Sequence, residues 1–199
     1  AEAQMREYKR LADRMVAIDP SDPKWQLEQK YADTNLGIVL VDVGRYQEAA
    51  GVFRHSLDEA ERLVAEAPGN ADYRKTQIET LAWLADALEY NGQIDDALAR
   101  REQQIGILDG LLREARIDPD YRRQAMVANR AAGRLYATRG DLAEGLRHLQ
   151  AATKLGQELY RIERDNADWA GLAAFAQLDR AAVELAAGDL DGQPCRARS

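Results

Sequence analysis

The fold is decided by residues 37–53, which read GIVLVDVGRYQEAAGVF. Gly44 lies between two segments in which apolar residues recur every three or four positions, the spacing of an amphipathic helix. The same pattern returns in residues 85–101 and again in residues 133–149, with a constant step of 48. A fixed step of this length, without insertions, is typical of a helical repeat protein. The sequence therefore predicts pairs of helices joined at a glycine.

Three columns of residues keep the step of 48 and indicate where the helices begin and end. They hold a glycine, an aromatic residue and an acid or amide: Gly44, Gly92, Gly140 and Gly188; Trp25, Tyr73, Tyr121 and Trp169; Asp22, Asn70, Asp118 and Asn166. An Asp or Asn side chain at a helix start caps it by accepting from the amides of the first turn. A glycine just past a helix adopts the left-handed conformation that ends it. Each unit is thus predicted to be a hairpin with a long first helix and a long second helix.

The register of these columns predicts a single repeat domain over residues 1–199. Three complete repeats are expected at 22–66, 70–116 and 118–164, preceded by the second helix of a truncated repeat at 1–18. The first helix of a fourth, capping repeat is expected at 166–188, and a polar tail at 189–199. The sequence starts in mid-repeat, at Ala1 and without Met, so we expect it to be a fragment of a longer protein.

Small residues occupy fixed columns in both helices of each hairpin. They are Gly37, Ala85, Gly133 and Ala181 in the first helix, and Ala49, Ala97 and Gly145 in the second. Small side chains allow two helix backbones to approach closely, so we expect each hairpin to be tightly packed. Arg101 interrupts an apolar column formed by Phe53 and Leu149, and its stem is expected to lie along the surface with the charge in water.

These residues resemble the signature of the tetratricopeptide repeat (TPR) family. Gly37, Gly44, Tyr46, Ala49 and Phe53 follow its spacing, and the next two repeats follow it again. Because the usual period of that family is about 34 residues, the resemblance is to a long-repeat variant, as found in tails of bacterial signalling proteins. It implies an all-α, right-handed superhelical solenoid of about seven to eight long helices, whose first helices line a concave surface that binds proteins.

Composition excludes several other classes of protein. The 199 residues carry 27 Lys and Arg against 34 Asp and Glu, a net charge of −7, which argues against nucleic acid as a partner. No apolar run is long enough to cross a membrane and no signal segment is evident, so membrane insertion is not expected and the cytoplasm is favoured over export. The single Cys195 cannot form an internal disulfide.

Catalytic chemistry is not expected either. No nucleophile, base and acid occur in a recognisable arrangement, and neither His55 nor His148 has a second ligand at a metal-binding spacing. Both histidines fall away from the apolar columns and are predicted to lie on the surface. The sequence therefore predicts a protein without enzymatic activity, metal or cofactor.

The remaining candidate for function is the exposed surface of the first helices. Acids outnumber bases in residues 22–69 and 70–117, whereas residues 118–165 hold nine bases and seven acids. A surface that is basic at one end and acidic at the other suits an extended peptide or a partner domain of complementary charge. We call the predicted contact residues the first-helix surface: Tyr31, Thr34, Glu79, Trp83, Asp86, Glu89, Arg130 and Arg134.

Two alternatives stay open at this stage. Asp86 and Glu89 could simply pair with Arg130 and Arg134 across adjacent helices, because exposed ion pairs are common. The chain could also be a self-association or regulatory module, possible as a homodimer, in a larger bacterial signalling protein such as a kinase or transcription regulator. An apolar terminal stripe, formed by Phe175, Leu178 and Leu185, would then join the protomers.

Overall fold

The described part of the chain is entirely helical. The computed structural model describes residues 1–114 and 118–190, with side chains up to residue 188, so Cys195 and nearly all of the predicted tail lie outside the described residues. Eight helices are found in these ranges: α1 (Glu2–Ile18), α2 (Pro23–Asp42), α3 (Tyr46–Glu66), α4 (Ala71–Tyr90), α5 (Ile94–Glu114), α6 (Pro119–Arg139), α7 (Leu142–Ile162) and α8 (Ala167–Leu190). The predicted all-α class and the succession of hairpins are confirmed.

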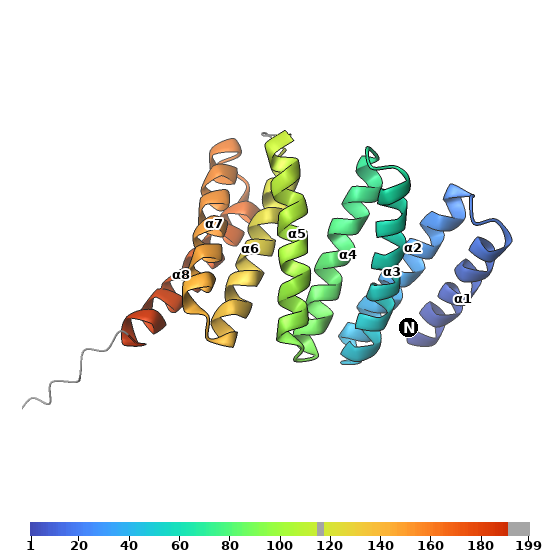
Figure 1. The fold of residues 1–199 in the computed structure, drawn as a ribbon, viewed down its shortest axis with the longest axis horizontal. Coiled ribbons are helices and arrows are strands. Elements are labelled where there is room, and N and C mark those ends of the chain that lie inside the picture. The colour runs from blue at the N-terminus through green and yellow to red at the C-terminus, as the bar shows by residue number, and fades with distance from the viewer. Residues whose placement is uncertain (115–117, 191–199) are drawn as a thin grey trace, which may run out of the picture. The chain divides into compact units, whose positions relative to one another are not determined.

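The helices group into two compact units, residues 1–100 and 101–199, which divide within α5. In the first unit α1 packs on α2, α2 on α3, and α3 on α4 (Figure 1). In the second unit α6 packs on α7, α7 on α8, and α6 also touches α8. The predicted single repeat domain and the right-handed superhelix concern the arrangement of the two units, and they stay predictions.

The predicted N-caps form as expected. The side chains of Asp22, Asn70 and Asp118 each accept from the backbone amide two residues on, at 2.8 to 3.0 Å, and Asn166 accepts from the amide of Trp169 at 3.1 Å. These bonds satisfy amides that have no partner inside the helix. The cap column therefore marks the start of α2, α4, α6 and α8.

The glycine column ends the first helices at three of its four positions. Gly44, Gly92 and Gly140 have φ of 77°, 77° and 97°. At Gly44 the amides of Gly44 and Arg45 bond back to the carbonyls of Val41 and Leu40, which is the Schellman pattern. The prediction is wrong at Gly188, because α8 continues through it to Leu190. Glycine permits the left-handed conformation but does not impose it.

Close packing of each hairpin explains the columns of small residues. A Cβ atom added to Gly133 of α6 would lie 2.6 Å from Cγ of Leu149 and 2.9 Å from the carbonyl oxygen of Gly145, both on α7. A Cβ on Gly37 of α2 would lie 2.4 Å from the ring of Phe53 on α3. The two helices of each of these hairpins can therefore reach their observed separation only with glycine at these positions.

Candidate interaction surfaces

The first-helix surface divides between the two units. Its first six residues lie on α2 and α4 of the first unit, and Arg130 and Arg134 lie on α6 of the second. Each set is therefore described within its own unit.

Aromatic side chains are exposed on the first-helix surface of the first unit. Tyr31 is 49% exposed and Trp83 is 39% exposed, whereas Thr34, Asp86 and Glu89 are half-buried. The ring of Trp83 stacks on that of Phe53 with centroids 6.1 Å apart, which fixes the indole while leaving one side open. Tyrosine and tryptophan held in this way are the side chains that most often dominate protein interfaces.

A second aromatic pair extends this feature along the α3–α4 seam. Tyr46 and Tyr90 lie 5.4 Å apart between ring centroids, seven residues along each helix from Phe53 and Trp83. Seven residues are two helical turns, so both pairs lie on the same face of the antiparallel helices. Tyr90 is 58% exposed, and it was not among the predicted contact residues, although its spacing from Trp83 could have indicated it.

Glu79 already has a partner within the first unit. Its carboxylate lies 3.6 Å from Nζ of Lys30 on α2, and both side chains are more than 30% exposed. An exposed pair at this distance contributes little to stability and can exchange with another partner.

Arg130 is held by α8 in the second unit. Its Nε lies 2.6 Å from Oδ2 of Asp179, and its guanidinium lies 5.2 Å from the centre of the Phe175 ring. Each side chain of the ion pair is 25% exposed. One alternative left open by the sequence pairs this arginine with Asp86 or Glu89. In the structure its ion-pair partner is Asp179 on α8, the next first helix along the chain.

The terminal stripe is exposed in the structure. Phe175, Leu178 and Leu185 of α8 are 53%, 64% and 68% exposed. Other residues of α8 are buried in the second unit: Ala173, Ala176 and Val183. The helix is therefore packed along one face and open along the rest.

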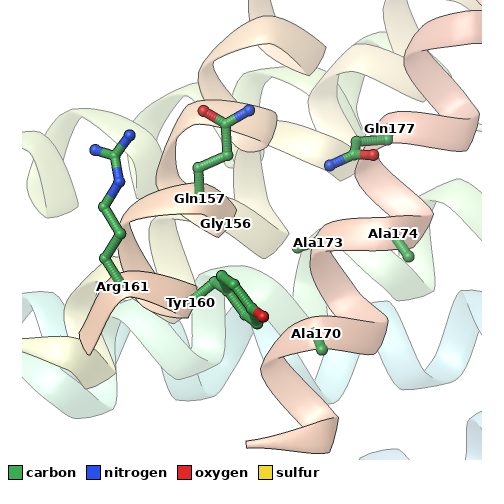
Figure 2. Close-up of a pocket in the computed structure, with 8 residues that line it drawn as sticks. All are labelled: Gly156, Gln157, Tyr160, Arg161, Ala170, Ala173, Ala174 and Gln177. Carbon is green, nitrogen blue, oxygen red and sulfur yellow. The ribbon is translucent and has the colours of Figure 1, made fainter. Parts of the chain in front are cut away.

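A shallow groove between α7 and α8 was not foreseen from the sequence. Figure 2 shows its eight lining residues, Gly156, Gln157, Tyr160 and Arg161 from α7 and Ala170, Ala173, Ala174 and Gln177 from α8. Its volume is about 330 Å³. The floor is made of small side chains, because α7 and α8 approach so closely that a Cβ on Gly156 would lie 2.8 Å from that of Ala173.

His148 is buried, so the prediction of a surface histidine is wrong for this residue and right for the exposed His55. Its ring stacks on Tyr136 of α6 at 5.3 Å, and its Nδ1 lies 2.9 Å from Oδ1 of Asn129. The spacing could have revealed this, because His148 is three residues from Gly145 and so shares the face of α7 that packs on α6. Arg101 is also buried rather than spread along the surface, and it donates to Oε1 of Gln104 at 2.9 Å.

His148 has a polar partner at each of its ring nitrogens. Nδ2 of Asn129 donates to the carbonyl of Ala125, so Oδ1 of Asn129 accepts from Nδ1–H of His148. At the other ring nitrogen, Nε2, the guanidinium of Arg147 lies at 2.7 Å. Glu102 of α5 lies 2.9 Å from the same nitrogen and also accepts from the hydroxyl of Tyr136.

Burial lowers the pKa of His148 below its ordinary value of 6.5, and the nearby Arg147 lowers it further, while the Glu102 carboxylate opposes both. The unfolded chain therefore takes up a proton at this histidine at a higher pH than the folded chain does. We expect stability to fall as the pH drops through 6.5. Melting temperatures measured from pH 8 to 5.5 should decrease for the natural chain and decrease less for His148→Gln. An equal decrease in both proteins would show that the lowered pKa of His148 is not the cause of the pH dependence.

The described residues hold no cluster of metal-ligating side chains. No group of three or more His, Cys, Asp or Glu among them could hold a metal ion. Within the same ranges, no helix combines the length and the apolar character that a membrane span requires.

Comparison with solved structures supports the fold. The structure matches two crystal structures of nearly identical TPR-like repeats from a Podosopora anserina protein assigned as a kinesin light chain, the second of them a point-substituted form of the first. Both are 19% identical, with TM-scores of 0.52 and 0.53; the alignments cover 90% and 92% of this chain and 88% and 90% of those chains. BtubC (BKLC) from P. vanneervenii aligns over 100% of this chain and 94% of its own, with 15% identity and a TM-score of 0.42.

The comparisons of sequence add no relative. No protein-family model matches the chain, and no curated protein matches it. At 19% identity the structural matches establish the fold alone. The described residues thus form an all-α, TPR-like repeat fold of eight helices packed in successive hairpins.

Proposed function

We propose that the protein is a non-catalytic scaffold that binds a peptide or a partner domain on its concave first-helix surface. TPR-like repeat folds generally serve as protein-interaction scaffolds, and stacked helical hairpins offer an extended surface for this purpose. The long 48-residue repeat and a place in a bacterial signalling protein, which the sequence resemblance implies, belong to the same proposal.

The observation that carries this proposal is the exposure of aromatic side chains on the first helices that also contact a neighbouring helix. Trp83 is held by Phe53 yet remains 39% exposed, and Phe175 is 53% exposed beneath the guanidinium of Arg130. A bound segment could cover these rings at a low cost in conformational entropy, because packing already limits their motion. Arg130 and Arg134 would then select peptides that carry a carboxylate beside an apolar residue.

Selection from a random peptide library displayed on phage tests this function. The immobilised chain should enrich peptides with an acidic residue near an aromatic or aliphatic one. The double change Arg130→Glu and Arg134→Glu should reduce binding of a selected peptide at least about tenfold, because both cations are replaced by like charges. Trp83→Ala should weaken the same peptide if the first unit contributes to the surface.

A matched control separates binding from folding. Charge reversal at Arg130 also removes its ion pair with Asp179, so Asp179→Asn removes that pair while leaving the arginine in place. The Asp179→Asn variant should have a melting temperature close to that of the charge-reversed variant and should still bind the peptide. Equal binding by the reversed variant and the natural chain would exclude the arginines from the site.

A second candidate function, self-association as a regulatory module, is favoured by the exposure of the terminal stripe. Three large apolar side chains on one helix form the kind of patch that often marks an interface. Sedimentation equilibrium tests it, since a chain that stays at 22.2 kDa at all concentrations does not self-associate.

A further inference from the structure

One face of helix α4 carries acids and aromatic rings in alternation. The face is formed by residues at intervals of four, three and four, which lie in line on a helix: Glu79, Trp83, Asp86 and Tyr90. We call these four residues the α4 stripe. It consists of two similar pairs, each an acid followed four residues later by a ring. The second pair repeats the first after seven residues, or two helical turns.

Both rings of the α4 stripe rest against a second ring and are still exposed. Trp83 stacks on Phe53, and Tyr90 lies against Tyr46, with both partner rings on α3 of the same unit. Trp83 and Tyr90 are among the large apolar side chains that remain open to solvent. The face of an aromatic ring is negative in its charge distribution, so it attracts cations. The rings and the carboxylates of the stripe therefore favour the same kind of ligand.

The charge around the α4 stripe is strongly negative. Residues 1–100 hold 19 Asp and Glu against 12 Lys and Arg, so the first unit accounts for the whole net charge of −7. Residues 76–99 contain five acids and neither Lys nor Arg. One cation already lies against the stripe, since Nζ of Lys30 is 3.6 Å from the carboxylate of Glu79. Asp86 has a contact of its own as well, so a cationic partner would join or exchange with existing contacts.

The second unit shows how an acid and a ring on one helix hold a guanidinium. Arg130 of α6 has its Nε 2.6 Å from Oδ2 of Asp179 and its guanidinium carbon 5.2 Å from the centre of the Phe175 ring. Phe175 and Asp179 are four residues apart on α8, which is the spacing within each pair of the α4 stripe, although here the ring comes first. A ring and a carboxylate at this spacing thus bind an arginine that comes from another segment.

We propose that the α4 stripe binds arginine side chains of a basic peptide, with one guanidinium at each pair of acid and ring. This inference rests on the proposed function, because it names the ligand that the first unit selects on the first-helix surface. Arginine fits better than lysine, since its planar guanidinium stacks on rings and bonds a carboxylate through two N–H groups. The two pairs lie about 10 Å apart along the helix, a distance that an extended peptide covers in about three residues. Arginines separated by two residues should therefore bind best.

Binding of three synthetic peptides with blocked ends tests the proposal. GGRAARGG should bind the natural chain at low ionic strength, as measured by fluorescence anisotropy of the labelled peptide. GGARRAGG has the same composition with adjacent arginines, and GGKAAKGG has the same charge on lysines. Each of these two should bind at least about threefold more weakly. Equal binding of the lysine peptide would overturn the assignment to a guanidinium, and equal binding of adjacent arginines would overturn the arrangement of one arginine at each pair.

Variants of the chain locate the bound peptide. Asp86→Asn should weaken binding of GGRAARGG at least about fivefold, because a charged hydrogen-bond acceptor is lost, and Tyr90→Ala should weaken it about threefold. Asp58→Asn is the matched control, since it removes the same charge from an exposed position on α3 that lies outside the stripe. It should bind like the natural chain, and all three variants should melt close to it. A loss with Asp58→Asn as large as with Asp86→Asn would overturn the proposal, because net charge alone would then explain binding.

Failure of this proposal can be told apart from failure of the proposed function. If library-selected peptides bind through Arg130 and Arg134 while GGRAARGG does not bind, the α4 stripe is not an arginine site and the proposed function stands. The same conclusion holds if GGRAARGG binds equally well to the Asp86→Asn and Tyr90→Ala variants. If the library yields no peptide and GGRAARGG does not bind either, both proposals are overturned.

Discussion

Replacing Gly133 with alanine is expected to destabilise the second unit by about 2–3 kcal/mol, although alanine is normally the better residue in a helix. The added Cβ would lie 2.6 Å from Cγ of Leu149 and 2.9 Å from the backbone oxygen of Gly145. Leu149 is fully buried and cannot move away, and a backbone oxygen can yield only if α7 shifts. Thermal unfolding followed by circular dichroism should show a melting temperature lower by about 10 °C or more.

Gly171→Ala provides the matched control in the same unit. Gly171 is an interior residue of α8, and a Cβ added there meets no atom within 4 Å. This variant should be as stable as the natural chain or more stable, by up to about 1 kcal/mol. If both variants had the same effect, the close approach of α6 and α7 would not be what selects glycine at position 133.

Replacing Lys9 with leucine is expected to release α1 from the first unit. The ammonium group of Lys9 lies 2.5 Å from Oδ1 of Asp33, whose side chain is 4% exposed, and Ser56 donates to the other carboxylate oxygen. Without the cation, a buried carboxylate would lack its counter-charge, which costs about 2–4 kcal/mol. Hydrogen exchange of residues 2–18 should accelerate, because α1 is the element that this ion pair joins to α2.

The chain itself supplies the compensating change. One repeat later, the positions of Lys9 and Asp33 are occupied by Leu57 and Leu81, both buried. Lys9→Leu combined with Asp33→Leu should therefore restore slow exchange in α1, since a buried ion pair can often be replaced by well-packed apolar residues without loss. A double variant as unstable as the single one would contradict this account.

The fold could be predicted from the sequence because its signals are local. Asp22, Asn70 and Asp118 cap the first turn of their own helices, and Gly44 and its equivalents act on their own turn. Gly188 has the same residue in the same column but stays helical. Its conformation depends on whether the chain turns there to pack a second helix, which a single residue does not encode.

The buried polar residues are encoded less fully by local signals, because the spacing of His148 from Gly145 indicates the helix face that it shares but not its partner. Arg101 stands where the other repeats have Phe53 and Leu149, so its column predicts an apolar residue or an exception at the surface. His148 stands at the position of Val52, outside the apolar columns that the sequence indicates. Their burial depends on partners from other helices, Asn129 for the histidine, which lies 19 residues away in sequence. For the first-helix surface, exposure of Trp83 and Tyr31 agrees with the expected position, while their role in binding stays a prediction.

The ion pair of Lys9 and Asp33 has a consequence for how the chain finds its correct pairing. In a protein built from similar hairpins, a helix that is displaced by one repeat meets a neighbour of nearly the same shape. Such a displacement would bring Lys9 against Leu81 instead of Asp33, and an unpaired charge would be buried. His148 would likewise lose Asn129 and meet Leu81 if α7 packed on α4 in place of α6. Polar contacts that differ from one repeat to the next thus make each interface between helices distinct. They disfavour the misaligned and swapped assemblies to which uniform repeats are prone.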